Sequence, residues 1–255
     1  MSPMEIPKLH DSSLPVFLIL WYMLLYILGY FILFKNWDKR YRPEASSCLM
    51  SLAHGSLAPV LSIFSILQSQ KSITKIDFTF PNTPFQNLVL EYSIAYFCTD
   101  LLHYMVFNPG DVLFIAHHLG TLYVLATCRY VIQHGAVAIL GVLVLAEVTS
   151  ICQNTWSLAR HQKGESAKAA SVFDFLSPIF YAYYSVVRGI LGPMFVCGIV
   201  GVFSSGAADG VIPRWAWISW IVVMVSGIGA SILWVVHLWI DLCRQISKKE
   251  LKKSS

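Results

Sequence analysis

Charged residues are scarce in this sequence of 255 residues, of which only 13% are Asp, Glu, Lys or Arg. Hydrophobic residues make up 56% of the chain. A soluble domain usually has about 25% charged residues, because its surface must be hydrated. The composition therefore excludes an ordinary soluble domain and predicts an all-α protein whose helices cross a membrane several times.

Cysteine motifs are absent as well, because no two of the six cysteines form a Cys-x-x-Cys pair. All six lie inside or at the ends of apolar runs, where cysteine usually acts as a small packing residue. The spacing therefore gives no indication of a disulfide framework or a zinc ribbon. We expect neither a bound metal nor a permanent cofactor.

Three further classes of protein lack the residues that they require. Membrane di-iron enzymes need several His-x-x-x-His or His-x-x-His-His sets, and the eight histidines here form none. Retinal-type receptors need a lysine in their last span, but residues 215–243 contain no lysine. Nucleic-acid binding has no support, because the basic clusters are short and lie at the ends of apolar runs.

The sequence does contain long apolar runs. A bilayer core about 30 Å thick is crossed by about 20 helical residues. Seven runs approach or exceed this length, at 14–34, 47–68, 86–107, 112–132, 135–157, 176–204 and 214–242. We therefore predict about seven transmembrane helices. The sixth contains Pro178 and Pro193, which remove helix hydrogen bonds, so we expect it to be kinked.

Basic residues gather at alternate ends of these runs, and this pattern sets the predicted orientation. The less basic ends carry little beyond Lys8, Lys71, Lys75 and Arg214. Because lysine and arginine are enriched in cytosolic loops, we predict a lumenal N-terminus and a cytosolic C-terminus. The basic set comprises Lys35, Lys39, Arg40, Arg42, Arg160, Lys163, Lys168, Arg244, Lys248, Lys249, Lys252 and Lys253.

The chain ends with Lys252 and Lys253 in the third and fourth positions from the C-terminus. This spacing is typical of the dilysine signal that returns membrane proteins to the endoplasmic reticulum, an address that a receptor reads. We therefore predict a multipass protein of the endoplasmic reticulum membrane, with the COPI coat as a partner of the tail. A solvated basic tail is the alternative interpretation.

Two adjacent histidines, His117 and His118, lie about five residues inside the fourth run. An imidazole facing lipid is costly unless something hydrogen-bonds to it. Adjacent helix positions point about 100° apart, so at least one ring must face the protein interior. The pair is therefore the best marker of a site in this chain.

Other polar residues lie at similar depths in the predicted cytosolic half of the membrane. Facing lipid, each ionisable one would cost about 2.5–3.5 kcal/mol, so we expect them to share a cavity. This set comprises His54, Asp100, His103, Glu147, Ser150, Asn154, Arg188 and His237. An ordinary interhelical hydrogen bond or a structural ion pair is the alternative for each.

Spacing and depth predict specific pairings within this set. Asp100 and His103 are separated by three positions and are expected to be within hydrogen-bonding reach. Glu147 is the acidic residue closest in depth to Arg188, which makes it the expected counter-ion. Glu147, Ser150 and Asn154 fall on one helix face.

Several segments together resemble the TLC-domain family, which includes the ceramide synthases. These are residues 96–101 (YFCTDL), 117–121 (HHLGT), 147–150 (EVTS), 153–154 (QN) and 188–193 (RGILGP). The resemblance implies an all-α barrel of about six spans around a central cavity, over residues 40–245. Residues 1–39 would then form a lumenal segment and a first anchor, and residues 246–255 a cytosolic tail.

The resemblance also implies a catalytic set of His117, His118, Asp100 and Glu147. Ceramide synthases, however, carry a His-Asp-x-x-Asp element in the span after the histidine pair. The matching stretch here has Glu147 for one aspartate and Ser150 for the other. The chain is thus more similar to the smaller TLC-domain proteins implicated in membrane lipid homeostasis.

The sequence is compatible with three functions. The first is lipid homeostasis in the endoplasmic reticulum, with membrane lipids as partners and a lipid or acyl chain bound in the cavity. The second is a ceramide-synthase-like N-acyltransferase with acyl-CoA as co-substrate, whose phosphates would be attracted by Arg40, Arg42, Arg160 and Lys163. The third is a cargo receptor or membrane chaperone.

Overall fold

The computed structural model describes residues 13–70 and 76–254. These residues are almost entirely helical, and the one β-bridge among them joins Pro81 and His134 in neighbouring loops. The predicted all-α fold is therefore confirmed. Side chains are not described for residues 245, 246 and 248–255, so the predicted dilysine signal lies outside the described side chains.

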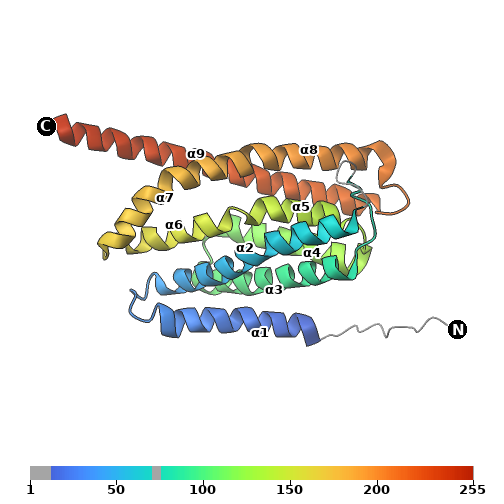
Figure 1. The fold of residues 1–255 in the computed structure, drawn as a ribbon, viewed down its shortest axis with the longest axis horizontal. Coiled ribbons are helices and arrows are strands. Elements are labelled where there is room, and N and C mark those ends of the chain that lie inside the picture. The colour runs from blue at the N-terminus through green and yellow to red at the C-terminus, as the bar shows by residue number, and fades with distance from the viewer. Residues whose placement is uncertain (1–12, 71–75, 255) are drawn as a thin grey trace.

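The helices form long rods, and consecutive rods run in opposite directions (Figure 1). Several rods consist of more than one element, because a π-helical turn or a short break interrupts the α-helix. The elements are α1 (Ser13–Leu28), η1 (Gly29–Leu33), α2 (Arg42–Ser69), α3 (Pro84–Phe107), α4 (Val112–Ala126), η2 (Thr127–Ile132), α5 (Ala136–Glu147), α6 (Ser150–Gln162), α7 (Ala167–Val186), η3 (Val187–Leu191), α8 (Gly192–Val202), η4 (Phe203–Ala207) and α9 (Arg214–Ser254).

Local sequence explains where two of the rods begin. Thr83 caps α3 by accepting a hydrogen bond from the backbone of Gln86, whose side chain accepts one from Thr83 in return. Pro84 follows the cap, at the helix position where proline's missing N–H costs least. Asp111 caps α4 in the same way through the backbone N–H of Phe114.

Six rods within the described residues are long and apolar enough to cross a membrane. Their outer surfaces expose large apolar side chains such as Phe17, Phe31 and Met194, each more than 60% exposed. Patches of this kind are rare on soluble monomers, and they match a lipid environment. The chain is therefore a multipass membrane protein.

The rod α3 differs from the other six. It is 24 residues long, but it is less apolar and buries Gln86, Glu91, Asp100 and His103 against its neighbours. Length alone would let it cross a bilayer. The total of seven crossings therefore stays a prediction.

Two predicted runs differ from the observed rods. The run at 135–157 is broken at Val148 and Thr149, where α5 ends and α6 begins. The run at 176–204 extends over residues 167–207, and its axis changes direction between the labels α7 and α8 (Figure 1). A bend in the rod that contains Pro178 and Pro193 agrees with the predicted kink.

Because the rods alternate in direction, the loops at 34–41, 108–111 and 163–166 lie at one end of the molecule (Figure 1). This end carries Lys35, Lys39 and Lys163, as expected from the charge pattern. We call it the basic end. Its cytosolic orientation stays a prediction.

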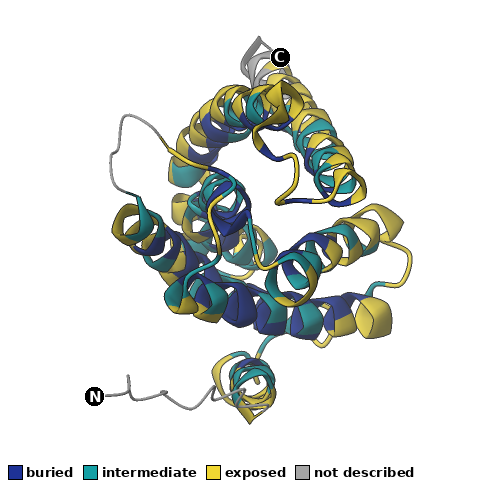
Figure 2. Ribbon diagram, turned by 90° about the vertical axis from the view of Figure 1, so that its right-hand side faces the viewer, coloured by how far each residue is buried: buried dark blue, intermediate teal, exposed yellow. Residues whose placement is uncertain are grey.

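Viewed along the rods, α1 lies at the edge of the group (Figure 2). It is attached by Tyr22, which is fully buried with its ring 5.5 Å from that of Tyr92 and 5.6 Å from that of Tyr96. The other rods supply the lining of two central cavities. The barrel of six helices stays a prediction.

An ion pair joins α3 to η2 near the end opposite the basic end. Arg129 Nη2 lies 2.6 Å from Glu91 Oε1, and Arg129 Nε donates to the same oxygen at 2.7 Å. The two side chains are only 16% and 9% exposed. Removing one partner of such a pair leaves a buried charge unpaired, which is the costly outcome.

We expect Arg129→Met to lower the free energy of unfolding by about 3–5 kcal/mol. The double variant Glu91→Gln, Arg129→Met should regain a large part of this loss, because no unpaired charge then remains. Thermal unfolding of the purified proteins in detergent measures the stability of the single and the double variant. Arg214→Met, which breaks an exposed pair with Asp209, should cost at most about 1 kcal/mol. A double variant no more stable than Arg129→Met would contradict this account.

Candidate functional site

Two cavities lie between the rods. The outer cavity has a volume of about 480 Å³ and is lined largely by polar side chains of α2, α3, α4, α6 and α9, including Glu44, Ser47, Asp100, Asn154 and Arg160. The inner cavity has a volume of about 120 Å³ and is lined mainly by Val, Leu, Ile and Met of α4, α5, α8 and α9. Among the described residues that line either cavity, none comes from α1.

The two cavities adjoin. Four residues line both of them, namely His117, Arg188, Gly227 and Ser231. We call these residues the junction. The outer cavity reaches the basic end, where Asn108, Asp111 and His161 contribute to its lining.

His118 and Asp100 form the closest buried acid–base contact of the site. Imidazole Nε2 lies 2.9 Å from Asp100 Oδ2, and both side chains are 3% exposed. Asp100 Oδ1 also accepts from Ser47 at 2.6 Å, and Tyr96 donates to Oδ2 at 3.4 Å. Residues from three rods therefore fix the carboxyl group.

The partners of His118 determine where protons sit. Nδ1 lies 2.9 Å from the carbonyl oxygen of Phe114, which can only accept, so Nδ1 carries a proton. A second proton must then lie between Nε2 and Asp100, because two lone pairs would repel at 2.9 Å. Both ring nitrogens are thus occupied, and the pair as a whole is electrically neutral.

His117 has the opposite environment. Its ring lines both cavities and is exposed to them, and none of the described hydrogen bonds involves its ring nitrogens. The ring lies beside Gly227 of α9, where an added Cβ would be 3.7 Å from Nδ1. The sequence predicted that at least one histidine faces inward. In the structure both nitrogens of His118 have partners within the protein, whereas those of His117 are free to bind a ligand in the cavities.

Glu147 pairs with a histidine from another rod. Its Oε2 accepts from Ser150 at 2.7 Å and lies 3.5 Å from His54 Nδ1. The other nitrogen of His54 lies 3.2 Å from Ser93, whose hydroxyl donates to Val89 and therefore accepts from the imidazole. His54 is fully buried behind Glu147 and stacks on Tyr96 at 4.1 Å.

Arg188 is not in contact with Glu147, so the predicted ion pair is wrong. Instead its guanidinium donates to the carbonyl oxygen of Ala146, in the last turn of α5. This carbonyl is available because α5 ends at Glu147, and helix C-termini leave carbonyl groups without helical partners. The cation therefore caps a helix end, a favourable position for positive charge.

Asp100 and His103 do not pair either. His103 Nδ1 lies 3.2 Å from the hydroxyl of Tyr26, and Nε2 lies 3.9 Å from Glu44. Its ring thus faces α1 and lines a small apolar groove there rather than either cavity. His237 is also outside the cavities: it is exposed on α9 with its Nδ1 2.7 Å from its own helix carbonyl at Leu233.

The remaining predicted residues lie close to the site. Asn154 lines the outer cavity, where its amide donates to Ser51 and to the backbone of Ser150 at 2.8 Å each. Ser150 is buried and holds Glu147 rather than lining a cavity. Both share the helix face of Glu147 across the break between α5 and α6.

Sequence reasoning missed the residues that support this arrangement. Ser47 and Tyr96 hold Asp100, and Gly55 lets α2 approach α6. A single serine or glycine in an apolar run gives no signal of such a role. Tyr96, however, precedes Asp100 by four positions, and this spacing places the two on one helix face.

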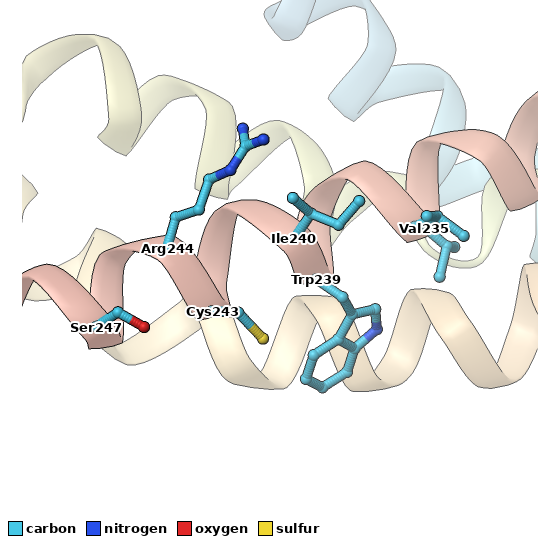
Figure 3. A pocket seen from close by; sticks show the side chains of 7 residues that line it. Val235, Trp239, Ile240, Cys243, Arg244 and Ser247 are labelled. Carbon is cyan, nitrogen blue, oxygen red and sulfur yellow. The ribbon is translucent and has the colours of Figure 1, made fainter.

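Two further features of the described residues bear on where a ligand or metal could bind. A broad depression on α9 is lined by Val235, Trp239, Ile240, Cys243 and Arg244, but these residues come from one helix and no polar groups converge there (Figure 3). Within the described residues, no group of three or more His, Cys, Asp or Glu side chains is arranged to hold a metal ion.

Gly55 provides a test of the packing around Glu147. A Cβ at this position would lie 2.4 Å from Ser150 Cβ and 3.3 Å from Glu147 Oε2. Gly55→Ala should therefore separate α2 from α6 and destabilise the protein by about 1–3 kcal/mol, as overpacking does. Gly198→Ala, where an added Cβ meets nothing within 4 Å, should not lower the thermal midpoint, because alanine is more favourable than glycine inside a helix. Equal midpoints for the two variants would contradict the close approach.

Comparison with known proteins identifies the family of the chain. No solved structure matches the chain. The TLC domain-containing protein At5g14285 of Arabidopsis thaliana is 51% identical over 240 residues, covering 93% of this chain and 92% of that protein. The family model for the TLC domain matches residues 44–240, a range that includes all the residues lining the two cavities. The chain therefore belongs to the TLC-domain family.

Proposed function

We propose that this protein binds a membrane lipid in its two cavities and acts in membrane lipid homeostasis in the endoplasmic reticulum. The apolar part of the lipid occupies the inner cavity, and the polar part lies in the outer cavity. A void lined this way, inside a membrane domain, is the observation that carries the proposal. Ligand sites are usually apolar pockets with a few placed polar groups.

The sizes of the cavities are compatible with this division. At about 480 Å³ the outer cavity falls within the usual range of about 300–1,000 Å³ for ligand pockets. The inner cavity, at about 120 Å³, holds only a short apolar segment. The lipid would enter or leave through the outer cavity, which reaches the basic end.

The proposed location depends on the tail. Lys252 and Lys253 match the dilysine pattern, and α9 is long enough to carry them beyond the membrane: it has 41 residues, or about 60 Å at 1.5 Å per residue. A bilayer with its headgroups is only about 40–45 Å thick. The tail would then be accessible to the COPI coat in the cytosol.

Acyl transfer from acyl-CoA is the second candidate, and the position of His117 favours it. This imidazole has available nitrogens at the junction, whereas both nitrogens of His118 are occupied. His117 would be the base that takes the proton of the amine as its nitrogen attacks the thioester carbonyl, the C–S bond would break, and CoA would leave as the thiol. His118 and Asp100 would keep the start of α4 in place.

Gly227 allows a direct test of lipid binding. Gly227→Leu should fill the junction, because position 227 lines both cavities and faces His117. Mass spectrometry of protein extracted in mild detergent should then show at least fivefold less bound lipid than the wild type. Gly229→Leu is the matched control on the same helix, where a Cβ meets nothing within 4 Å, and it should change lipid content less than twofold. Wild-type protein without lipid, or equal lipid in both variants, would refute the proposal.

The second candidate is tested with palmitoyl-CoA and sphinganine in reconstituted membranes. If the wild type forms the amide, His117→Ala should lower the rate at least about 100-fold, the usual contribution of a positioned base. His237→Ala should leave the rate unchanged, because His237 lies outside both cavities. A wild type without activity, or a His117→Ala variant with full activity, would eliminate acyl transfer.

A further inference from the structure

Arg188 is a cation of the site that has no ion-pair partner among the described residues. It lies at the junction. Its Nε is fully buried and has no hydrogen-bond partner. A guanidinium in this position is expected to have an anionic partner, because an unpaired buried charge is costly.

The acidic residues that line the cavities are engaged elsewhere. Asp100 is paired with His118 at 2.9 Å, and Glu147 is held by His54 and Ser150. The other two are Glu44, which accepts from Asn108 at 3.1 Å, and Asp111, which caps α4 at the backbone N–H of Phe114 at 3.2 Å. None of these four carboxylates forms a described ion pair with Arg188.

The end of α5 balances the charge only in part. The carbonyl of Ala146 accepts one guanidinium hydrogen bond. A helix C-terminus is equivalent to about half a negative charge, so this contact offsets the charge of the guanidinium only in part. The guanidinium has five N–H donors, and one bond to Ala146 leaves most of them available.

His117 adds a second potential donor at the same place. Its ring lines both cavities with Arg188, and its nitrogens have no described hydrogen-bond partner. Gly227 faces the ring without a side chain and leaves the space open. Two side chains with free donors, at the boundary between a polar and an apolar cavity, match the headgroup of an amphiphile.

We propose that the junction binds the anionic oxygens of a carboxylate or phosphate group carried on an alkyl chain. Arg188 contributes the charge and His117 contributes a hydrogen bond. The chain begins at the junction and enters the inner cavity. This inference rests on the proposed binding of lipid and adds the charge of the headgroup to it.

The test compares radiolabelled dodecanoate, dodecyl phosphate and dodecanol in binding to the purified full-length protein in phosphatidylcholine nanodiscs. Empty nanodiscs correct for partition into lipid. We expect at least one of the two anions to bind at least tenfold more tightly than dodecanol. The tighter of the two anions identifies the headgroup as a carboxylate or a phosphate.

Variants then assign the preference to one residue. Arg188→Gln, which keeps a donor for Ala146, should bind dodecanol as the wild type does. Its preference for the anions over dodecanol should be less than threefold. Arg188→Lys should keep part of the preference. Arg160→Gln is the matched control, because it removes the same charge from the outer cavity but lies near the basic end, with its guanidinium 5.4 Å from the Trp156 ring.

The outcomes separate the two proposals. If the wild type binds none of the three probes, lipid binding itself fails. If dodecanol binds as tightly as both anions, lipid binding stands and the anionic headgroup is refuted. If Arg160→Gln abolishes the preference while Arg188→Gln retains it, the assignment to the junction is overturned. The comparison of probes on the wild type needs no variant to fold.

Discussion

A polar group inside a hydrocarbon layer is costly unless it finds a partner within the protein, and this constraint organises the centre of the molecule. Asp100 is satisfied by His118 and Ser47, and Glu147 by His54 and Ser150. Asp100 bonds to side chains of two other rods, and Glu147 lies 3.5 Å from His54 of α2, so contacts made by these acids also fix how the rods pack. The cavities lie next to these pairs, where the packing of rods is determined by polar contacts rather than by close apolar contact.

The sequence predicted the rods well and their interruptions poorly. Long apolar runs reveal membrane helices because burial in lipid demands them, and helix starts at Thr83 and Asp111 follow from their capping side chains. The break at Val148 and Thr149 left no such trace, since both residues are compatible with a continuous helix. Hydropathy measures how apolar a segment is and carries no information on where its backbone hydrogen bonds stop.

For the site, depth along a helix was predictable and rotation about its axis was not. Asp100, His117, Glu147 and Arg188 all line a cavity as expected. His237 and His103 have suitable depths but face away from the cavities, because the orientation of each helix is set by contacts between rods that one sequence does not display. For the same reason the two predicted pairs are wrong. Asp100 pairs with His118 on a neighbouring rod and not with His103, and Arg188 donates to the backbone carbonyl of Ala146 at the end of α5.

The close approach at Gly55 ties together two positions that are far apart in the chain. Ser150 occupies the space that a methyl group at position 55 would need. During divergence, a larger residue at 55 is tolerable only where 150 has become smaller, and the loss of the Ser150 hydroxyl would in turn leave Glu147 with one partner fewer. Positions 55 and 150 should therefore vary together across related sequences. Position 147 should vary with them, because its carboxylate depends on the Ser150 hydroxyl.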